Sequence, residues 1–232
     1  DKFLLHGLAL TLSLLSVFAI FKFHDYMDNY EIGILVGATI LFSWLGKTWL
    51  NFGRFFIASL ILSFISIYIY QGNLMQAENN FFLKYFLSSQ SAIMWMSALF
   101  PLSLIIYWIS LFSKQTFYEN LASALVWIAA LMGLLGLLVR WFESYLISID
   151  IGHIPISNLY EVFVLFCLIT SLMYLYYEQK MNTKKMGPFV LIIISAAVAF
   201  LLWYTFNKGA DEIQPLVPAL QSYWMKIHVP AN

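Results

Sequence analysis

Residues 121–139 read LASALVWIAALMGLLGLLV and contain no charged side chain. The hydrocarbon core of a bilayer is about 30 Å thick, so a helix needs roughly 20 mostly apolar residues to cross it. The stretch shows none of the regular apolar–polar alternation that marks the strands of a transmembrane barrel. It therefore predicts a transmembrane α-helix.

Six further stretches have a similar character: residues 3–23, 32–50, 55–70, 93–112, 160–177 and 189–206. Of the 232 residues in the chain, 62% are hydrophobic and only 10% are charged, whereas soluble domains carry about 25% charged residues. These observations predict an all-α, polytopic membrane helix bundle with about seven transmembrane helices. A single transmembrane domain over residues 1–232 is the simplest division.

The remaining composition excludes several classes of protein. The 12 Lys and Arg residues balance 12 Asp and Glu residues, and they form no basic stripe of the kind that binds nucleic acid. The chain has one cysteine, Cys167, which excludes a disulfide-rich secreted domain. Glycine-rich phosphate loops and the common zinc-protease and hydrolase motifs are absent from the sequence, so it shows no standard enzyme signature.

The loops between the apolar stretches indicate an orientation. Lys180, Lys184 and Lys185 lie in one short loop, and such clusters favour the cytoplasmic side. Because successive loops alternate between the two sides, the N-terminus is then cytoplasmic and an outer-face segment covers residues 207–232. His6 lies near the cytoplasmic end of the first stretch. The other three histidines fall on the outer side: His24, His153 and His228.

An aromatic run lies before the fourth apolar stretch. Residues 81–87 read FFLKYFL, in which Lys84 interrupts the apolar side chains. Aromatic and basic side chains together are typical of a helix that lies in the membrane interface. We therefore predict a short interfacial helix here, on the outer face.

The run GHIPISNLYE at residues 152–161 marks the start of the sixth apolar stretch. Pro155 interrupts regular structure, and Ser157 or Asn158 can cap the helix that follows. Glu161 then falls in the first turn of this helix, where the helix dipole favours a carboxylate. Helix capping therefore accounts for these polar residues.

Helix capping does not account for Arg140 or His153, which both lie at the membrane edge. Arg140 directly follows the apolar stretch 121–139 and precedes Trp141, and His153 precedes the capped helix. Neutral imidazole is a common metal ligand. We therefore treat His153 as a candidate cofactor ligand, with a purely structural histidine as the alternative.

The run PLVPALQSYWMKIH at residues 215–228 predicts a second interfacial helix. At 3.6 residues per turn its apolar side chains share one face, and His228 follows Trp224 by one turn. An imidazole beside an indole suits a flat apolar ligand with a metal at its centre, and haem iron commonly takes an axial histidine. Trp224 and His228 are therefore candidate haem-binding residues. A surface histidine in an interfacial helix is the alternative.

Together, Arg140-Trp141 and the runs at residues 152–161 and 217–229 resemble the CcsA family, the membrane core of System II cytochrome c synthases. In the fused form, CcsBA, the same polypeptide also carries the CcsB half. The resemblance covers roughly the last hundred residues, and the run SSQS at residues 88–91 is also similar to fused bacterial members.

This resemblance implies a function. Members of the family export haem b and hold it at the outer membrane face, while the thiols of an apocytochrome c CXXCH motif add to its vinyl groups. It implies a holocytochrome c synthase of the haem lyase type, with apocytochrome c, haem, the CcsB half and the lipid bilayer as partners. It also implies the bacterial inner membrane as the location, with a periplasmic C-terminal segment.

Within the family, two outer histidines bind haem iron on either side of a tryptophan-rich WWD segment, and His228 matches the first of them. We expect the WWD segment and the second histidine to follow Asn232, in a longer polypeptide. One alternative is a haem carrier of the related System I type, without ligase activity. Another is an unrelated seven-helix transporter or receptor, which would show buried charges in the middle of its spans, where this sequence is almost wholly uncharged.

Overall fold

The computed structural model describes residues 2–24, 27–113, 115–149 and 151–215. The chain folds as two compact units, the N-terminal unit Asp1–Ala58 and the main unit Ser59–Asn232. Each unit is described by itself. The predicted single domain stays a prediction, since one continuous helix runs across the division between the units.

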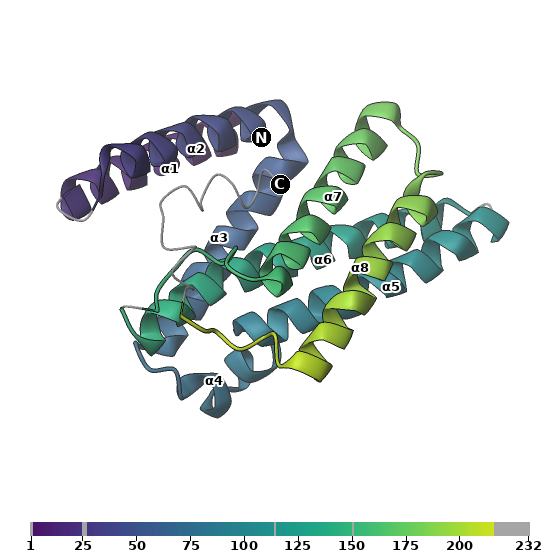
Figure 1. Cartoon of the computed structure of the whole chain (residues 1–232). Coiled ribbons are helices and arrows are strands. Elements are labelled where there is room, and N and C mark those ends of the chain that lie inside the picture. Colours follow the sequence, from purple (N-terminus) through teal and green to yellow (C-terminus); the bar gives the residue numbers. More distant parts are fainter. Residues whose placement is uncertain (1, 25–26, 114, 150, 216–232) are drawn as a thin grey trace. The chain divides into compact units, whose positions relative to one another are not determined.

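Helices dominate the described residues, which contain no β-strand (Figure 1). The helices are α1 (Lys2–Phe23), α2 (Asn29–Thr48), α3 (Leu50–Tyr70), α4 (Gln76–Asn79), the π-helical turn η2 (Leu83–Leu87), α5 (Ser89–Ser113), α6 (Thr116–Ile147), α7 (Leu159–Met181) and α8 (Gly187–Lys208). Six of the seven predicted stretches lie entirely within one long helix, and the stretch 32–50 overruns the end of α2 at Thr48 by two residues, the second of which begins α3. The all-α prediction is confirmed.

Six of these helices are long and apolar enough to cross a membrane: α2, α3, α5, α6, α7 and α8. In α1 the apolar segment is the shorter Gly7–Lys22. The prediction of a multi-pass membrane protein is therefore confirmed. The helix α6 continues eight residues beyond the predicted end at Val139, because no helix-breaking residue intervenes before Ser148. As a result, Arg140 and Glu143 are helical residues.

The N-terminal unit packs α1 against α2, with the start of α3. Ser16 and Thr39 are joined by a hydrogen bond of 2.5 Å between their hydroxyl groups. The ring of Phe42 in α2 stacks on Phe56 in α3, with 4.7 Å between the centroids. Asp28 caps α2. Small polar and stacked aromatic contacts therefore hold this unit together.

In the main unit, α5 packs along α6, α7 packs against α6 and α8, and α8 also contacts α5 (Figure 1). Glycines allow α5 and α6 to approach closely. Gly133 lies against Met96, and Gly136 lies against Ile93. Small residues at such contacts are the usual means by which membrane helices pack closely.

The predicted interfacial helix at residues 81–87 is a π-helical turn, η2. Leu83 and Leu87 point into the main unit and are buried, and Tyr85 accepts a 2.7 Å hydrogen bond from the Trp95 indole nitrogen through its carbonyl oxygen. Lys84 is exposed, and so are the aromatic side chains of Phe81, Phe82, Tyr85 and Phe86. The helical character is confirmed, and the place in the interface stays a prediction.

Candidate functional site

Arg140 is the centre of a buried polar cluster where α6 approaches the start of α7. Only 2% of its side chain is exposed, and its Nε donates a 2.7 Å hydrogen bond to Oε1 of Glu161, which is itself 1% exposed. The two form a buried ion pair. Loss of one partner from such a pair leaves an uncompensated charge.

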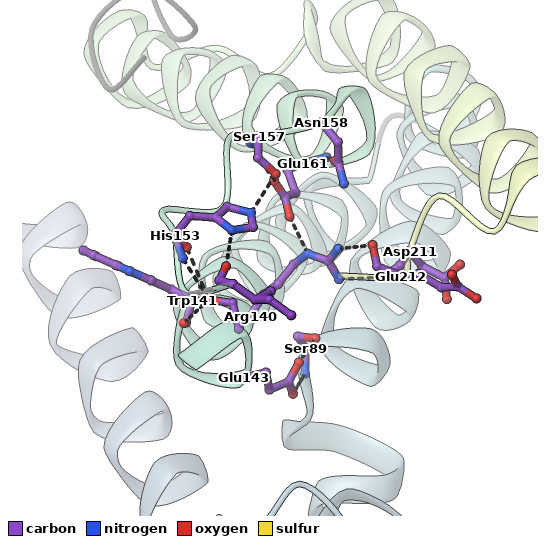
Figure 2. Close-up of polar contacts among 12 residues, drawn as sticks. Ser89, Arg140, Trp141, Glu143, His153, Ser157, Asn158, Glu161, Asp211 and Glu212 are labelled. Carbon is purple, nitrogen blue, oxygen red and sulfur yellow. Dashed lines mark hydrogen bonds and ion pairs between the residues drawn. The ribbon is translucent and has the colours of Figure 1, made fainter. Parts of the chain in front are cut away.

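The other two guanidinium nitrogens reach the chain just after α8. Nη1 donates to the carbonyl oxygen of Asp211 at 2.7 Å, and Nη2 donates to that of Glu212 at 3.3 Å (Figure 2). The guanidinium carbon also lies 5.3 Å from the centre of the Tyr160 ring, a cation–π distance. One side chain thus joins α6, α7 and the segment that follows α8.

Glu161 is held by the loop before α7. Its Oε2 accepts hydrogen bonds from the backbone nitrogen of Ser157 at 2.7 Å and from its hydroxyl at 2.8 Å. The Asn158 side chain accepts from the Glu161 backbone nitrogen at 2.9 Å and is the N-cap of α7. Capping was left open between Ser157 and Asn158, and the structure assigns it to Asn158.

His153 is 6% exposed and lies beside this carboxylate. Its Nδ1 is 2.5 Å from the carbonyl oxygen of Ile151, and its Nε2 is 2.8 Å from the hydroxyl of Ser157 (Figure 2). A carbonyl oxygen only accepts hydrogen bonds, so Nδ1 is the donor to Ile151. Nε2 contacts the Ser157 hydroxyl, whose single proton is donated to Glu161, so in this conformation neither ring nitrogen is open to a metal.

Gly152 allows the loop to pass close to α6. A Cβ atom at this position would lie 2.3 Å from the ring of Tyr145. The backbone nitrogen of His153 also donates to the Ser144 hydroxyl at 3.3 Å. These contacts fix His153 against the end of α6. We call Arg140, His153, Ser157, Asn158 and Glu161 the Arg140 cluster.

Glu143 lies one turn beyond Arg140 on α6 and is 6% exposed. Its Oε1 accepts hydrogen bonds from the Tyr70 hydroxyl at 2.5 Å and from the Ser89 backbone nitrogen at 3.0 Å, and its Oε2 accepts from the Ser89 hydroxyl. Gln90, the residue after Ser89 on α5, donates a hydrogen bond from its side-chain nitrogen to the Asp211 carboxylate at 2.8 Å. The start of α5 is therefore connected to both α6 and the chain after α8.

Glu143 was not among the residues predicted from the sequence to form the site. The run SSQS at residues 88–91, which is similar to fused bacterial members of the CcsA family, was the only indication of this contact in the sequence. Its members Ser89 and Gln90 supply the contacts just described. The acidic residue itself could not be linked to them, because more than fifty residues separate the partners.

A third buried carboxylate lies near the far end of α7. Glu178 is 6% exposed and accepts hydrogen bonds from the hydroxyls of Tyr107 at 2.8 Å, Tyr174 at 2.6 Å and Ser123 at 2.6 Å. Gly187 packs directly against the two tyrosine side chains. Four helices therefore meet at this group. Its sequence signal was an acidic residue near the end of an apolar stretch.

The other candidate residues are not part of the Arg140 cluster as described. Trp224 and His228 lie outside the described residues, as does the remainder of the predicted segment after Pro215. His24 is an exposed residue at the end of α1, and Cys167 is buried in α7. Among the described residues, no group of three or more His, Cys, Asp or Glu side chains is arranged to hold a metal ion.

Comparison with known proteins connects this region to a family. Residues 156–232, which begin within the Arg140 cluster, match the family model described as cytochrome C assembly protein. The "Cytochrome c biogenesis protein CcsA" of Chlorella vulgaris is 39% identical over 100 residues, which are 41% of this chain and 28% of that protein.

The CcsA proteins of Trieres chinensis and Guillardia theta are 38% and 35% identical over 132 and 133 residues. The chain is therefore similar to the CcsA proteins of cytochrome c biogenesis. The matched stretches cover 53% and 55% of the chain and only 38% and 40% of these two CcsA proteins. No solved structure gives a significant match to the chain.

Proposed function

We propose that this protein is the membrane core of a cytochrome c synthase, which exports haem and holds it while apocytochrome c is attached. The observation that carries the proposal is the match of residues 156–232 to the family model described as cytochrome C assembly protein, together with the similarity to CcsA proteins. This stretch includes Glu161 of the Arg140 cluster, and it also contains Trp224 and His228. The proposed substrates are haem b and an apocytochrome c with a CXXCH motif.

The chemistry of attachment agrees with the groups that the chain offers. Each thioether forms when a cysteine S–H of the apocytochrome adds across a vinyl C=C of haem, with sulfur bonded to one carbon and hydrogen to the other. No oxidant and no protein nucleophile are needed. The synthase supplies binding and orientation, and the buried Cys167 takes no part.

On this proposal His228 would bind the haem iron, and Trp224 would contribute to holding the haem. His153 is a second candidate ligand. Its Nε2 contacts Ser157 at 2.8 Å, so binding to iron would require that this contact open. The CcsB half, fused or separate, is the proposed protein partner.

We also propose the bacterial cytoplasmic membrane as the location, with residues 207–232 on the periplasmic side. The cluster Lys180, Lys184 and Lys185 supports this orientation. On this assignment the Arg140 cluster lies towards the periplasm, and Glu178 lies towards the cytoplasm.

The test of the proposal is the His228→Gly variant, purified from membranes with the haem that it retains. We expect the variant to lose haem, or to regain a six-coordinate spectrum only when imidazole is added. His24→Gly is the matched control and should keep the parent spectrum. A normal six-coordinate spectrum for His228→Gly would refute the ligand assignment.

A product assay then separates a synthase from a haem carrier of the System I type. Coexpression with CcsB and an apocytochrome should give covalent haem on the cytochrome, detected by haem staining after denaturing electrophoresis. Bound haem without any covalent product would favour the carrier.

A further inference from the structure

We propose that Arg140 is a positioning residue for haem: its guanidinium fixes the chain just after α8 and so sets where the segment that carries His228 begins. The inference rests on the proposed function, which gives His228 its role. Arg140 itself contacts neither iron nor porphyrin in this scheme.

The first argument is that each nitrogen of the Arg140 guanidinium donates a hydrogen bond to a different acceptor. Three of its nitrogens bind three different acceptors: a carboxylate oxygen of Glu161 and the carbonyl oxygens of Asp211 and Glu212. The side chain is 2% exposed, so water competes little for these hydrogen bonds. Charge-assisted bonds in such surroundings are stronger than those between neutral groups.

The second argument is that the guanidinium is itself held in place. Glu161 binds its Nε and is fixed in turn by the backbone nitrogen of Ser157 at 2.7 Å. The orientation of the Arg140 guanidinium is therefore set by Glu161 of α7. The carbonyl oxygens of Asp211 and Glu212 bind to a group that is already held in place. Arg140 was otherwise unexplained by helix capping.

The third argument is the path of the chain after α8. Gly209 ends this helix in a left-handed conformation with φ of 59°, which favours glycine. The chain then reaches Arg140 within three residues, and the Gln90 side chain holds Asp211 at 2.8 Å from another direction. Residues 209–212 are thus a fixed point, sixteen residues before His228.

The variant Arg140→Lys separates this role from that of the buried charge. Lysine keeps the positive charge next to Glu161 but has a single nitrogen and no planar fork. It cannot hold Glu161 and two successive carbonyl oxygens in the same geometry. The control is Glu212→Gln, which changes a side chain but leaves the carbonyl oxygen that Arg140 binds.

The first readout is made on haem-free protein in detergent, as the rate of tryptic cleavage after Lys208. Cleavage there requires the end of α8 and the following residues to open, and its rate follows the population of the open form. We expect about a tenfold faster cleavage in Arg140→Lys and an unchanged rate in Glu212→Gln.

The second readout is the absorption spectrum of the haem that copurifies. Arg140→Lys should show a fall in six-coordinate haem of about tenfold, restored by added imidazole. Equal cleavage in the parent and Arg140→Lys would overturn the proposal. So would faster cleavage with an unchanged spectrum, because the held segment would then not place the ligand.

Failure of the proposed function would look different. If His228→Gly kept a normal spectrum, the ligand assignment would fall, whereas the cleavage rates would still report on the contact of Arg140. If Arg140→Lys did not accumulate in membranes, Glu161→Gln replaces it. This variant keeps Arg140 but weakens the contact that orients its guanidinium, so cleavage after Lys208 should again be faster, and an unchanged rate would overturn the proposal.

Discussion

Gly136 on α6 packs against α5, and its replacement by alanine tests how closely the two helices must approach. A Cβ atom there would lie 2.6 Å from Cγ1 of Ile93 and 3.3 Å from the carbonyl oxygen of Ser89. Ile93 is fully buried, and a backbone oxygen cannot turn away. Overpacking of this kind costs about 1–3 kcal/mol, while the higher helix propensity of alanine returns only about 1 kcal/mol.

We therefore expect Gly136→Ala to lower the free energy of unfolding by up to about 2 kcal/mol. The shift would also disturb Ser89, which binds Glu143. The assay is unfolding in mixed micelles with increasing dodecyl sulfate, followed by far-ultraviolet circular dichroism. Haem content of the same samples shows whether the damage reaches the proposed site.

Gly133→Ala is the matched control, one turn earlier on the same face of α6. Its Cβ would lie 2.8 Å from the sulfur of Met96 and 3.5 Å from Cγ of that side chain. A flexible thioether can move aside, so we expect a change close to zero. The reasoning is refuted if Gly136→Ala proves as stable as Gly133→Ala.

Three further predictions concern the buried polar groups. Glu161→Gln leaves the Arg140 guanidinium without its anionic partner, so the free energy of unfolding should fall by about 3 kcal/mol. Replacing both Arg140 and Glu161 by methionine should cost less than this single change. Additive losses in a double-mutant cycle would contradict the coupling of the two residues. Tyr174→Phe removes one hydroxyl donor from Glu178 and should cost about 1.5–3 kcal/mol in the same assay, since the acceptor is charged; an unchanged midpoint would argue against the contact. Gly187→Ala places a Cβ 2.7 Å from the Tyr174 hydroxyl oxygen and should lower the free energy of unfolding of the protein by about 1–3 kcal/mol. An unaffected thermal midpoint would contradict this prediction.

The helices could be predicted from the sequence because a bilayer imposes a simple length and polarity on whatever crosses it. Local capping was also predictable in part: Asn158 and Glu161 lie three residues apart, and their hydrogen bond follows from helix geometry. The extension of α6 to Ile147 was less evident, because its last turns carry charged and polar residues beyond the apolar stretch.

The partners of Arg140 and Glu143 could not be predicted for two different reasons. Arg140 binds the carbonyl oxygens of Asp211 and Glu212, which every residue type possesses, so the sequence carries no mark of this contact. Glu143 binds Tyr70 and Ser89, whose hydroxyls are common throughout the apolar stretches. Both contacts depend on how distant helices meet.

The helix α7 carries a buried carboxylate near each end, Glu161 and Glu178, and each is tied to other helices. They are seventeen positions apart, or about 25 Å along the axis at 1.5 Å per residue. A piston-like shift or a rotation of α7 would therefore have to break both attachments at once. Any movement within the main unit is therefore better carried by the neighbouring helices, with α7 held fixed at both ends.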